Sequence, residues 1–248
     1  MATNKKVAVI TGASTGIGQA TKQLLRERGC TVYNLDVLPT DDDAPDQYLT
    51  CDVRSRQAVF DAVHRVQERA GRIDLLFANA GVHHVATMED TTEEALDRVI
   101  DINIKGVFYT LQAVVPLMRA QGKGSIVLMG SDQCHVGKGR SAVYGLTKGA
   151  IGQLTKSTAI DLAPHGIRVN CICPGSIDTP LLHGAVRNFV AATGATTEQV
   201  MQALQQAQPI QRLGEPREIA RAVAFMLSDE ASFMTGALMS VDGGYVCQ

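Results

Sequence analysis

The sequence predicts an α/β protein: a doubly wound parallel sheet of about seven strands with helices on both faces. Short β-rich apolar runs alternate with longer helical patterns from end to end, and a glycine-rich turn joins the first run to the first helical pattern. No internal repeat, low-complexity tract or long linker divides the 248 residues. We therefore expect one domain over residues 1–248.

The expected strands follow in order along the chain. They cover residues 6–11, 31–36, 47–53, 74–78, 125–129, 168–173 and 237–241. Among the helices that fit between them, one is expected over 15–29 and a long one over 142–163. The stretch VLPTDDDAPD after Asp36 is different, because two prolines and three consecutive aspartates leave no room for a crossover helix. We expect a bare acidic loop whose aspartates form a solvated edge rather than a cation site.

Composition and charge argue against several classes of protein. The chain is 45% hydrophobic and 19% charged with a formal net charge of -2, so neither nucleic acid nor an acidic membrane is an expected partner. No signal peptide is readable after MATNKK and no apolar run could span a bilayer, which predicts a cytoplasmic protein. The six cysteines are expected to be reduced and mostly buried, with Cys171 and Cys173 on one face of a strand. The histidines lack ligand spacing such as HxxxH, so we expect no metal site.

The first strand runs into the loop TGASTGIG and then into a helix. Glycines permit a tight turn and a close approach of the backbone to a ligand, and a helix N-terminus attracts a pyrophosphate. Asp36 ends the second strand about twenty residues later, where a carboxylate can accept hydrogen bonds from ribose hydroxyls. It would repel a 2'-phosphate, which favours NAD over NADP. Asp52 and Val53 either hold the adenine edge or, in the case of Asp52, cap the following helix.

The stretch YGLTK places Tyr144 and Lys148 four residues apart. On a helix these two side chains share a face. A cation beside a phenol lowers its pKa, which makes the tyrosine a usable general base near neutral pH.

Several motifs occur together in one order along the chain. They are GxxxGxG, Asn79-Ala80-Gly81, Asn103, Ser131 placed 13 residues before Tyr144, YxxxK, Pro174-Gly175 and the closing VDGG. Over essentially its whole length the chain thus resembles the short-chain dehydrogenase/reductase family. The stretches VNCICPGSIDTP and AGVHH also resemble its cytosolic hydroxybutyrate-type members.

The resemblance implies a Rossmann-type fold, a bound NAD and hydride transfer between the nicotinamide and a secondary alcohol or ketone. The implied catalytic residues are Asn103, Ser131, Tyr144 and Lys148. The implied cofactor-binding residues are Gly12, Ser14, Thr15, Gly16, Ile17, Gly18, Asp36, Asp52, Val53, Asn79, Ala80, Gly81, Tyr144, Lys148, Pro174, Gly175, Ile177 and Thr179. Relatives commonly pair the YxxxK helix and its neighbour, which implies a homotetramer or homodimer.

The segment SDQCHVGKGRSAVY between the serine and the tyrosine is unusually polar. We expect a small polar substrate, such as a hydroxy acid or sugar acid, in contact with Gln133, His135, Lys138 and Arg140, with Lys138 or Arg140 meeting its carboxylate. Residues 176–215, inserted after a strand end, are expected to form a substrate lid. Two alternatives stay open: an NADPH-dependent 3-oxoacyl thioester reductase, and a non-catalytic protein that senses the dinucleotide.

Overall fold

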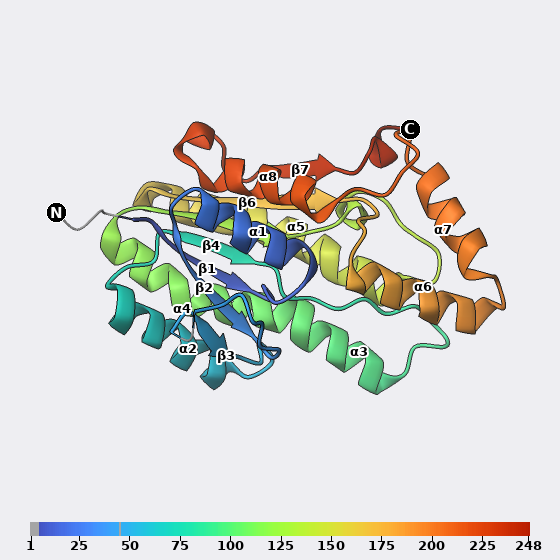
Figure 1. Cartoon of the computed structure of the whole chain (residues 1–248), viewed down its shortest axis with the longest axis horizontal. Coiled ribbons are helices and arrows are strands. Elements are labelled where there is room, and N and C mark those ends of the chain that lie inside the picture. The colour runs from blue at the N-terminus through green and yellow to red at the C-terminus, as the bar shows by residue number, and fades with distance from the viewer. Residues whose placement is uncertain (1–4, 45) are drawn as a thin grey trace.

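Seven parallel strands form one central sheet in the order β3-β2-β1-β4-β5-β6-β7 (Figure 1). The computed structural model describes residues 5–44 and 46–248 of the chain. Its strands are β1 (Val7–Thr11), β2 (Thr31–Asp36), β3 (Tyr48–Thr50), β4 (Leu75–Ala78), β5 (Gly124–Met129), β6 (Ile167–Pro174) and β7 (Leu238–Val241). Each neighbouring pair is parallel. The predicted doubly wound sheet is confirmed, and its strand order reverses between β1 and β4, where such sheets bind ligands.

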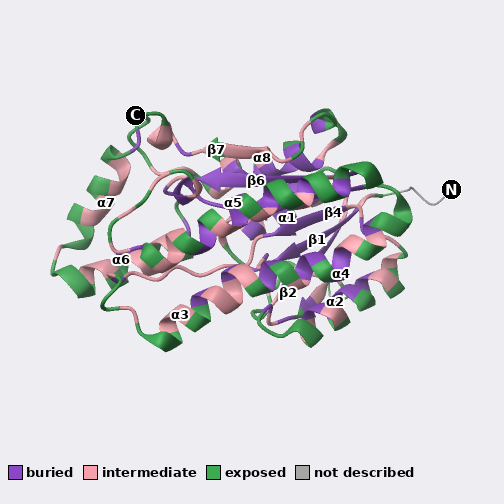
Figure 2. Ribbon diagram, turned by 180° about the vertical axis from the view of Figure 1, so that it is seen from behind, coloured by how far each residue is buried: buried purple, intermediate pink, exposed green. Residues whose placement is uncertain are grey.

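Helices cover both faces of this sheet. They are α1 (Gly16–Glu27), α2 (Arg56–Ala70), α3 (Glu93–Ile100), α4 (Gly106–Gln121), α5 (Ala142–Leu162), α6 (Pro180–Thr193), α7 (Thr197–Gln206) and α8 (Pro216–Leu227). One apolar cluster joins α2, α4 and α5 to one face, and a second joins α1 and α8 to the other. Side chains alternate along a strand, so in β1 Val9 packs into the first cluster and Ile10 into the second. Figure 2 shows the central strands β1, β4 and β6 buried between these layers, whereas the edge strand β7 is mostly of intermediate burial.

Several strand ends differ from the prediction by one residue, and the end of the third strand differs by three. The third strand was expected over 47–53 but is only Tyr48–Thr50. Its last residue pairs with Asp36, the end of β2, so the chain beyond has no neighbouring strand to pair with. The sixth strand instead continues to Pro174, which pairs with β7 through its last residue. The long helix starts at Ala142 as expected.

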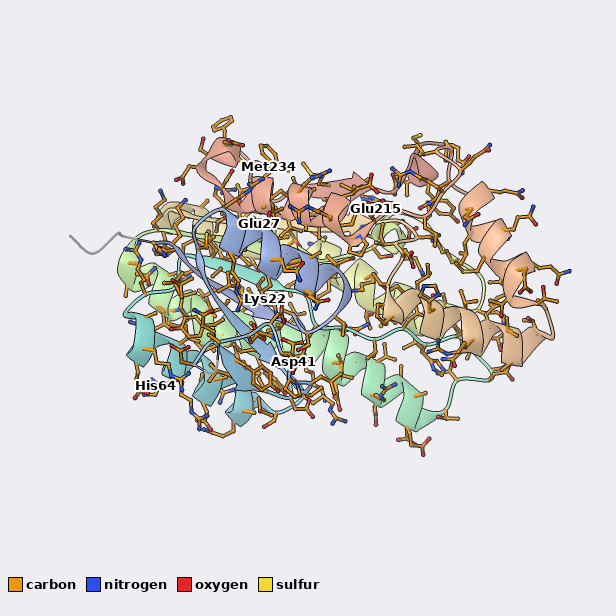
Figure 3. The ribbon with its side chains drawn as sticks, viewed as in Figure 1. Lys22, Glu27, Asp41, His64, Glu215 and Met234 are labelled. Atoms are coloured by element: carbon orange, nitrogen blue, oxygen red, sulfur yellow. The ribbon has the colours of Figure 1, made fainter. Side chains whose placement is uncertain are left out.

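The acidic loop after β2 is only partly as expected. No helix occurs in its described residues, 37–44 and 46–47. The expected solvated edge holds for Asp41 and Asp42, which are exposed, but not for Asp43, whose side chain is 1% exposed. Its carboxylate lies 3.0 Å from Lys22 Nζ and 2.7 Å from Arg26 Nη2. The Lys22 side chain is completely buried in α1 (Figure 3), and a buried ammonium needs such a counter-charge.

Residues 176–215 supply α6 and α7, which lie beside one end of the sheet (Figure 1). Val186 is the buried residue of α6, and α7 contributes none. These two helices therefore add little to the core. None of the helices in the described part of the chain is long and apolar enough to cross a membrane.

Candidate active site

A cavity of about 890 Å³ opens at the carboxyl ends of the central strands, beneath α6 and α7. Most of the residues predicted from the sequence line it. They are Gly12, Thr15, Gly16, Ile17, Asp36, Asp52, Val53, Asn79, Ala80, Gly81, Ser131, Gln133, Lys138, Arg140, Tyr144, Lys148, Pro174, Gly175, Ile177 and Thr179. The fold thus brings together residues that lie more than 160 positions apart in the chain.

Four of the predicted residues are not part of the cavity lining. Ser14 lies behind the loop, where its N–H donates to the Asp36 carboxylate at 3.0 Å. Gly18 packs under Gly12, since a Cβ at Gly18 would lie 2.2 Å from the Gly12 carbonyl oxygen. Asn103 is buried behind the wall. His135 is exposed on the outside of the molecule, so the structure does not bring it to the predicted substrate position.

The glycine loop forms a cradle that larger residues would fill. Gly12 has φ +69°, and a Cβ there would lie 2.9 Å from the Ala80 Cα; Gly16 has φ +56°. The N-terminus of α1 follows directly, and the side chain of Thr15 does not cap it. Its N–H groups are therefore open to an anion. This cradle fits the pyrophosphate of a dinucleotide.

Two carboxylates, Asp36 and Asp52, border the cavity near the ends of β2 and β3. Asp36 accepts hydrogen bonds from the N–H groups of Ser14 and Leu38, at 3.0 and 3.1 Å, which fixes its position at the end of β2. Asp52 forms an ion pair with Arg54, with Nη2 2.6 Å from Oδ2. The hydrogen bond from Arg54 holds the pKa of Asp52 below its usual value. The Arg54 cation is thereby engaged by a carboxylate.

Asn79 and Asn103 hold the wall beside β4. Asn79 Nδ2 donates to the carbonyl oxygen of Gly12 at 2.8 Å, which ties the glycine loop to the end of β4. Asn103 lies in a π-helical turn, Asp101–Lys105, and exchanges two hydrogen bonds of 2.9 Å with the main chain of Val82. Such π-helical turns are frequent at functional sites. The turn places the Asn103 amide next to Gly81, between that loop and the helix that carries Lys148.

Ser131 begins the short turn after β5, and its hydroxyl donates to Asp132 Oδ1 at 2.8 Å. The other oxygen of Asp132 lies 2.5 Å from Lys138 Nζ. The Lys138 ammonium also stands over the Tyr245 ring, 4.3 Å from its centre. The charge of Lys138 is therefore balanced by a buried carboxylate beside Ser131. The sequence analysis did not foresee this pair.

Tyr144 and Lys148 occupy the first turns of α5, on the face towards the cavity. Lys148 Nζ donates to the carbonyl oxygen of Met129 at 2.8 Å and lies 5.4 Å from the centre of the Tyr144 ring. Burial lowers the pKa of Lys148 to about 8. Burial also raises the pKa of Tyr144, and a hydrogen bond with Ser131 offsets this only in part. This differs from the expectation that Lys148 lowers the pKa, because removal of water from the phenol dominates here.

His83 is a site residue that the sequence analysis did not single out. Its ring lies 4.3 Å from the Tyr144 ring, centre to centre, at an angle of 41°. Nε2 is 3.3 Å from Ser141 Oγ, whereas Nδ1 has no hydrogen-bond partner among the described residues. Burial, followed by the nearby charge of Lys138, lowers the pKa of His83 to about 4. Its position two residues after Gly81, at the end of a central strand, was the available signal.

Comparison with known proteins agrees with this geometry. A family model described as Enoyl-(Acyl carrier protein) reductase matches residues 12–246. The oxidoreductase UcpA of Escherichia coli (strain K12) is 38% identical over 250 residues, which cover 96% of this chain and 94% of that protein. The cis-4-hydroxycyclohexanecarboxylate dehydrogenase of Sinomonas cyclohexanicum is 38% identical over 251 residues, which cover 97% of this chain and 96% of that protein.

Among solved structures, the ligand-free aldohexose dehydrogenase of Thermoplasma acidophilum matches with a TM-score of 0.91 and 34% identity, covering 98% of this chain and 95% of that one. The chain belongs to the short-chain dehydrogenase/reductase family. It is therefore an oxidoreductase of CH–OH groups that uses a nicotinamide dinucleotide.

Proposed function

We propose that the protein is an NAD-dependent dehydrogenase of small polar secondary alcohols, hydroxy acids or sugar acids above all. The observation that carries the choice of cofactor is the Asp36 carboxylate at the end of β2, held in place by two main-chain N–H groups. A carboxylate there accepts hydrogen bonds from the adenosine ribose and repels a 2'-phosphate. Of the nearby cations, Arg54 is engaged by Asp52 and Lys22 by Asp43.

Residues in and beside the cavity have separate roles in the proposed reaction. When bound, the nicotinamide supplies the acceptor for a hydride from the carbinol carbon. The Ser131 hydroxyl positions the substrate oxygen, and the Tyr144 phenol exchanges a proton with that oxygen. Lys148 would hold the nicotinamide ribose and supply positive charge beside Tyr144, and Thr179 would contact the carboxamide. Asn103 holds the wall next to Lys148 and supports its connection to solvent.

A polar substrate is supported by the wall opposite the cofactor cradle. His83 Nδ1 and Arg140 Nε are buried atoms without hydrogen-bond partners in the described part of the chain, and both residues line the cavity. A buried polar atom without a partner costs about 1–3 kcal/mol, which a polar substrate would recover. The name of the hydroxycyclohexanecarboxylate dehydrogenase makes a hydroxy acid the substrate of that relative. Arg140 is the better candidate for a carboxylate, because the buried Asp132 holds Lys138 at 2.5 Å, whereas the exposed Asp90 lies 3.8 Å from Arg140 Nη2.

The substrate proposal is tested with the double variant Lys138→Ala/Arg140→Ala. We expect KM for a hydroxy acid to rise about 10-fold or more, because the variant loses a charge-assisted hydrogen bond to the carboxylate. KM for the matching neutral ester should change little. His135→Ala is the control. It should leave KM unchanged for both the acid and the ester, since His135 is outside the cavity. An equal rise of KM for acid and ester in the double variant would contradict the proposal.

Two other functions can be distinguished from this proposal by experiment. A 3-oxoacyl thioester reductase is supported by a relative of that name, the 3-oxoacyl-[acyl-carrier-protein] reductase FabG of Thermotoga maritima, which is 36% identical over 252 residues. It would prefer NADPH, so cofactor preference decides between the two enzymes.

A protein that only senses the dinucleotide would need neither Ser131 nor Tyr144. Tyr144→Phe should lower kcat by about 1000-fold through the loss of acid–base catalysis. NADH binding, followed by fluorescence, should stay within a factor of about two to three. Turnover that survives in Tyr144→Phe would contradict the proposed role of Tyr144.

Residues 176–215 are proposed to act as a lid. Apolar side chains of α6 and α7, among them Leu182, Phe189 and Leu204, face the same cavity as Tyr144.

We also propose that copies of the chain pair through α4 and α5. Ile160 and Leu146 on α5 are 74% and 57% exposed, and such apolar side chains favour burial at an interface. Light scattering that reports a monomer at micromolar concentration would contradict the pairing.

A further inference from the structure

Three cysteines that the proposed reaction does not use converge beneath the catalytic lysine. The sulfur atoms of Cys134, Cys171 and Cys173 all lie within 4.8 Å of one another. Cys171 and Cys173 lie two residues apart on one face of β6, next to the edge strand β7, and their sulfur atoms are 3.8 Å apart. Cys134 comes from the turn that begins at Ser131. The sequence analysis expected Cys171 and Cys173 to be buried, which is correct, but it did not foresee Cys134 as their neighbour.

The spacing of these sulfur atoms suits a metal ion. A triangle with sides of about 4 Å has its centre about 2.3 Å from each corner, which is the usual length of a zinc–sulfur bond. A disulfide is a different arrangement, because it requires two sulfur atoms about 2.0 Å apart. All six cysteines of the chain are free.

The surroundings select a soft ion. No His, Asp or Glu side chain joins the three sulfur atoms in the cluster defined by the described residues. Donor sets made of thiolates alone favour thiophilic ions such as Cu(I), Zn²⁺ or Cd²⁺ over Mg²⁺ or Ca²⁺. Cys171 and Cys173 are 0% exposed, so a three-coordinate ion would be shielded from water.

Charge and access are both compatible with such a site. Three thiolates and a divalent ion carry a net charge of about -1, and the Lys148 ammonium close by balances it. Cys134 is partly exposed and lines a shallow depression of about 340 Å³ on the outer surface, which gives an ion a way in.

We propose that Cys134, Cys171 and Cys173 form a binding site for a soft, thiophilic metal ion. On binding, the three thiols release their protons to solvent and three metal–sulfur bonds form, without any change of oxidation state. The Cys134 thiol also gives up its hydrogen bond to the Lys148 carbonyl oxygen, which is 3.1 Å from its sulfur. The ion would link the turn that carries Ser131 to β6. This proposal departs from our expectation of no metal site, which considered only the histidines.

Cd²⁺ is the probe of choice, because it is redox-inert and its bonds to thiolate sulfur absorb in the ultraviolet. The full chain, reduced and freed of metal with a chelator that is then removed, is titrated with Cd²⁺. We expect an absorbance increase that saturates at one equivalent, together with a rise of the thermal midpoint. Both signals should be lost in Cys134→Ser and in Cys171→Ala, whose folding is checked first by circular dichroism. Two variants keep the test valid if one of them fails to fold.

The double variant Cys30→Ser/Cys247→Ser is the matched control, because it removes two thiols that lie outside the cluster. It should keep both signals. The proposal is overturned if the wild type gives no saturable signal, if the signal persists in Cys134→Ser or Cys171→Ala, or if the control loses it. None of these readouts uses cofactor or substrate, so their outcome is independent of the proposed dehydrogenase activity.

Discussion

At the scale of single residues, His83 links the stability of the protein to pH. Its pKa is lowered from 6.5 to about 4, because burial disfavours the charged ring. Between these values the unfolded chain binds a proton that the folded protein does not. The free energy of unfolding therefore falls as the pH drops from 6.5 to 4, and this contribution is fully retained above pH 6.5. The shift corresponds to at most about 3 kcal/mol.

The variant His83→Phe keeps a ring against Tyr144 but cannot titrate. We expect it to be less sensitive to acid than the wild type, as measured by urea unfolding at pH 6.5 and at pH 4.5. His64→Phe is the control, because His64 is an exposed residue on α2 whose side chain is 72% exposed. Identical pH dependence in the wild type and His83→Phe would show that His83 is not buried in its neutral form.

Sequence patterns predicted some of these residues and not others. Ser131, Tyr144 and Lys148 could be found because their spacing along one turn and one helix is local. The contacts of His83 with Tyr144 and of Asp132 with Lys138 could not be predicted, because they depend on how separate segments meet in three dimensions. The direction of the pKa shift of Tyr144 could not be predicted either, because it depends on how much protein surrounds the phenol. A neighbouring lysine is only one part of that environment.

At the scale of elements, the ion pairs of Lys22 hold the loop between β2 and β3 against α1. Asp43, which accepts from Lys22, also accepts from Asn34 Nδ2 at 2.7 Å. Asn34 Oδ1 in turn accepts from the N–H of Ala13 at 3.1 Å, within the glycine loop. A chain of polar contacts thus connects the acidic loop to the cofactor cradle. The sequence could not show it, because an aspartate run gives no sign of a buried lysine on a neighbouring helix.

Lys22→Met should destabilise the protein by about 3 kcal/mol, because it leaves Asp43 buried without one of its two cations. It should also raise KM for NAD, since the contacts to the glycine loop loosen. Lys6→Met is the matched control: the side chains of Lys6 and its partner Asp229 are 38% and 64% exposed, and the loss should stay below about 1 kcal/mol. Urea unfolding of both variants checks this. Equal losses would mean that the Lys22 pairs contribute no more than a surface ion pair.

At the scale of the whole molecule, the parallel sheet with helices on both faces followed from the alternation of apolar runs and helical patterns. Parallel strands with helical crossovers leave few ways to arrange a sheet. The carboxyl ends then meet along one edge, so Gly12, Asp36, Ser131 and Thr179 had to approach one another. The shape of the cavity was not predictable, because α6 and α7 border it with few buried contacts of their own. Substrate choice depends on those helices and on the polar loop after Ser131.

The most direct test of the account is the initial rate of NADH formation from NAD, with NADP in parallel. The substrates are hydroxy acids and sugar acids, each matched to its neutral ester or parent alcohol. We expect kcat/KM for NAD to be at least about 100-fold higher than for NADP, because the Asp36 carboxylate repels a 2'-phosphate. We also expect the acids to be preferred over their neutral counterparts. Turnover confined to NADP would contradict the role of Asp36, and a preference for the neutral compounds would contradict the polar substrate site.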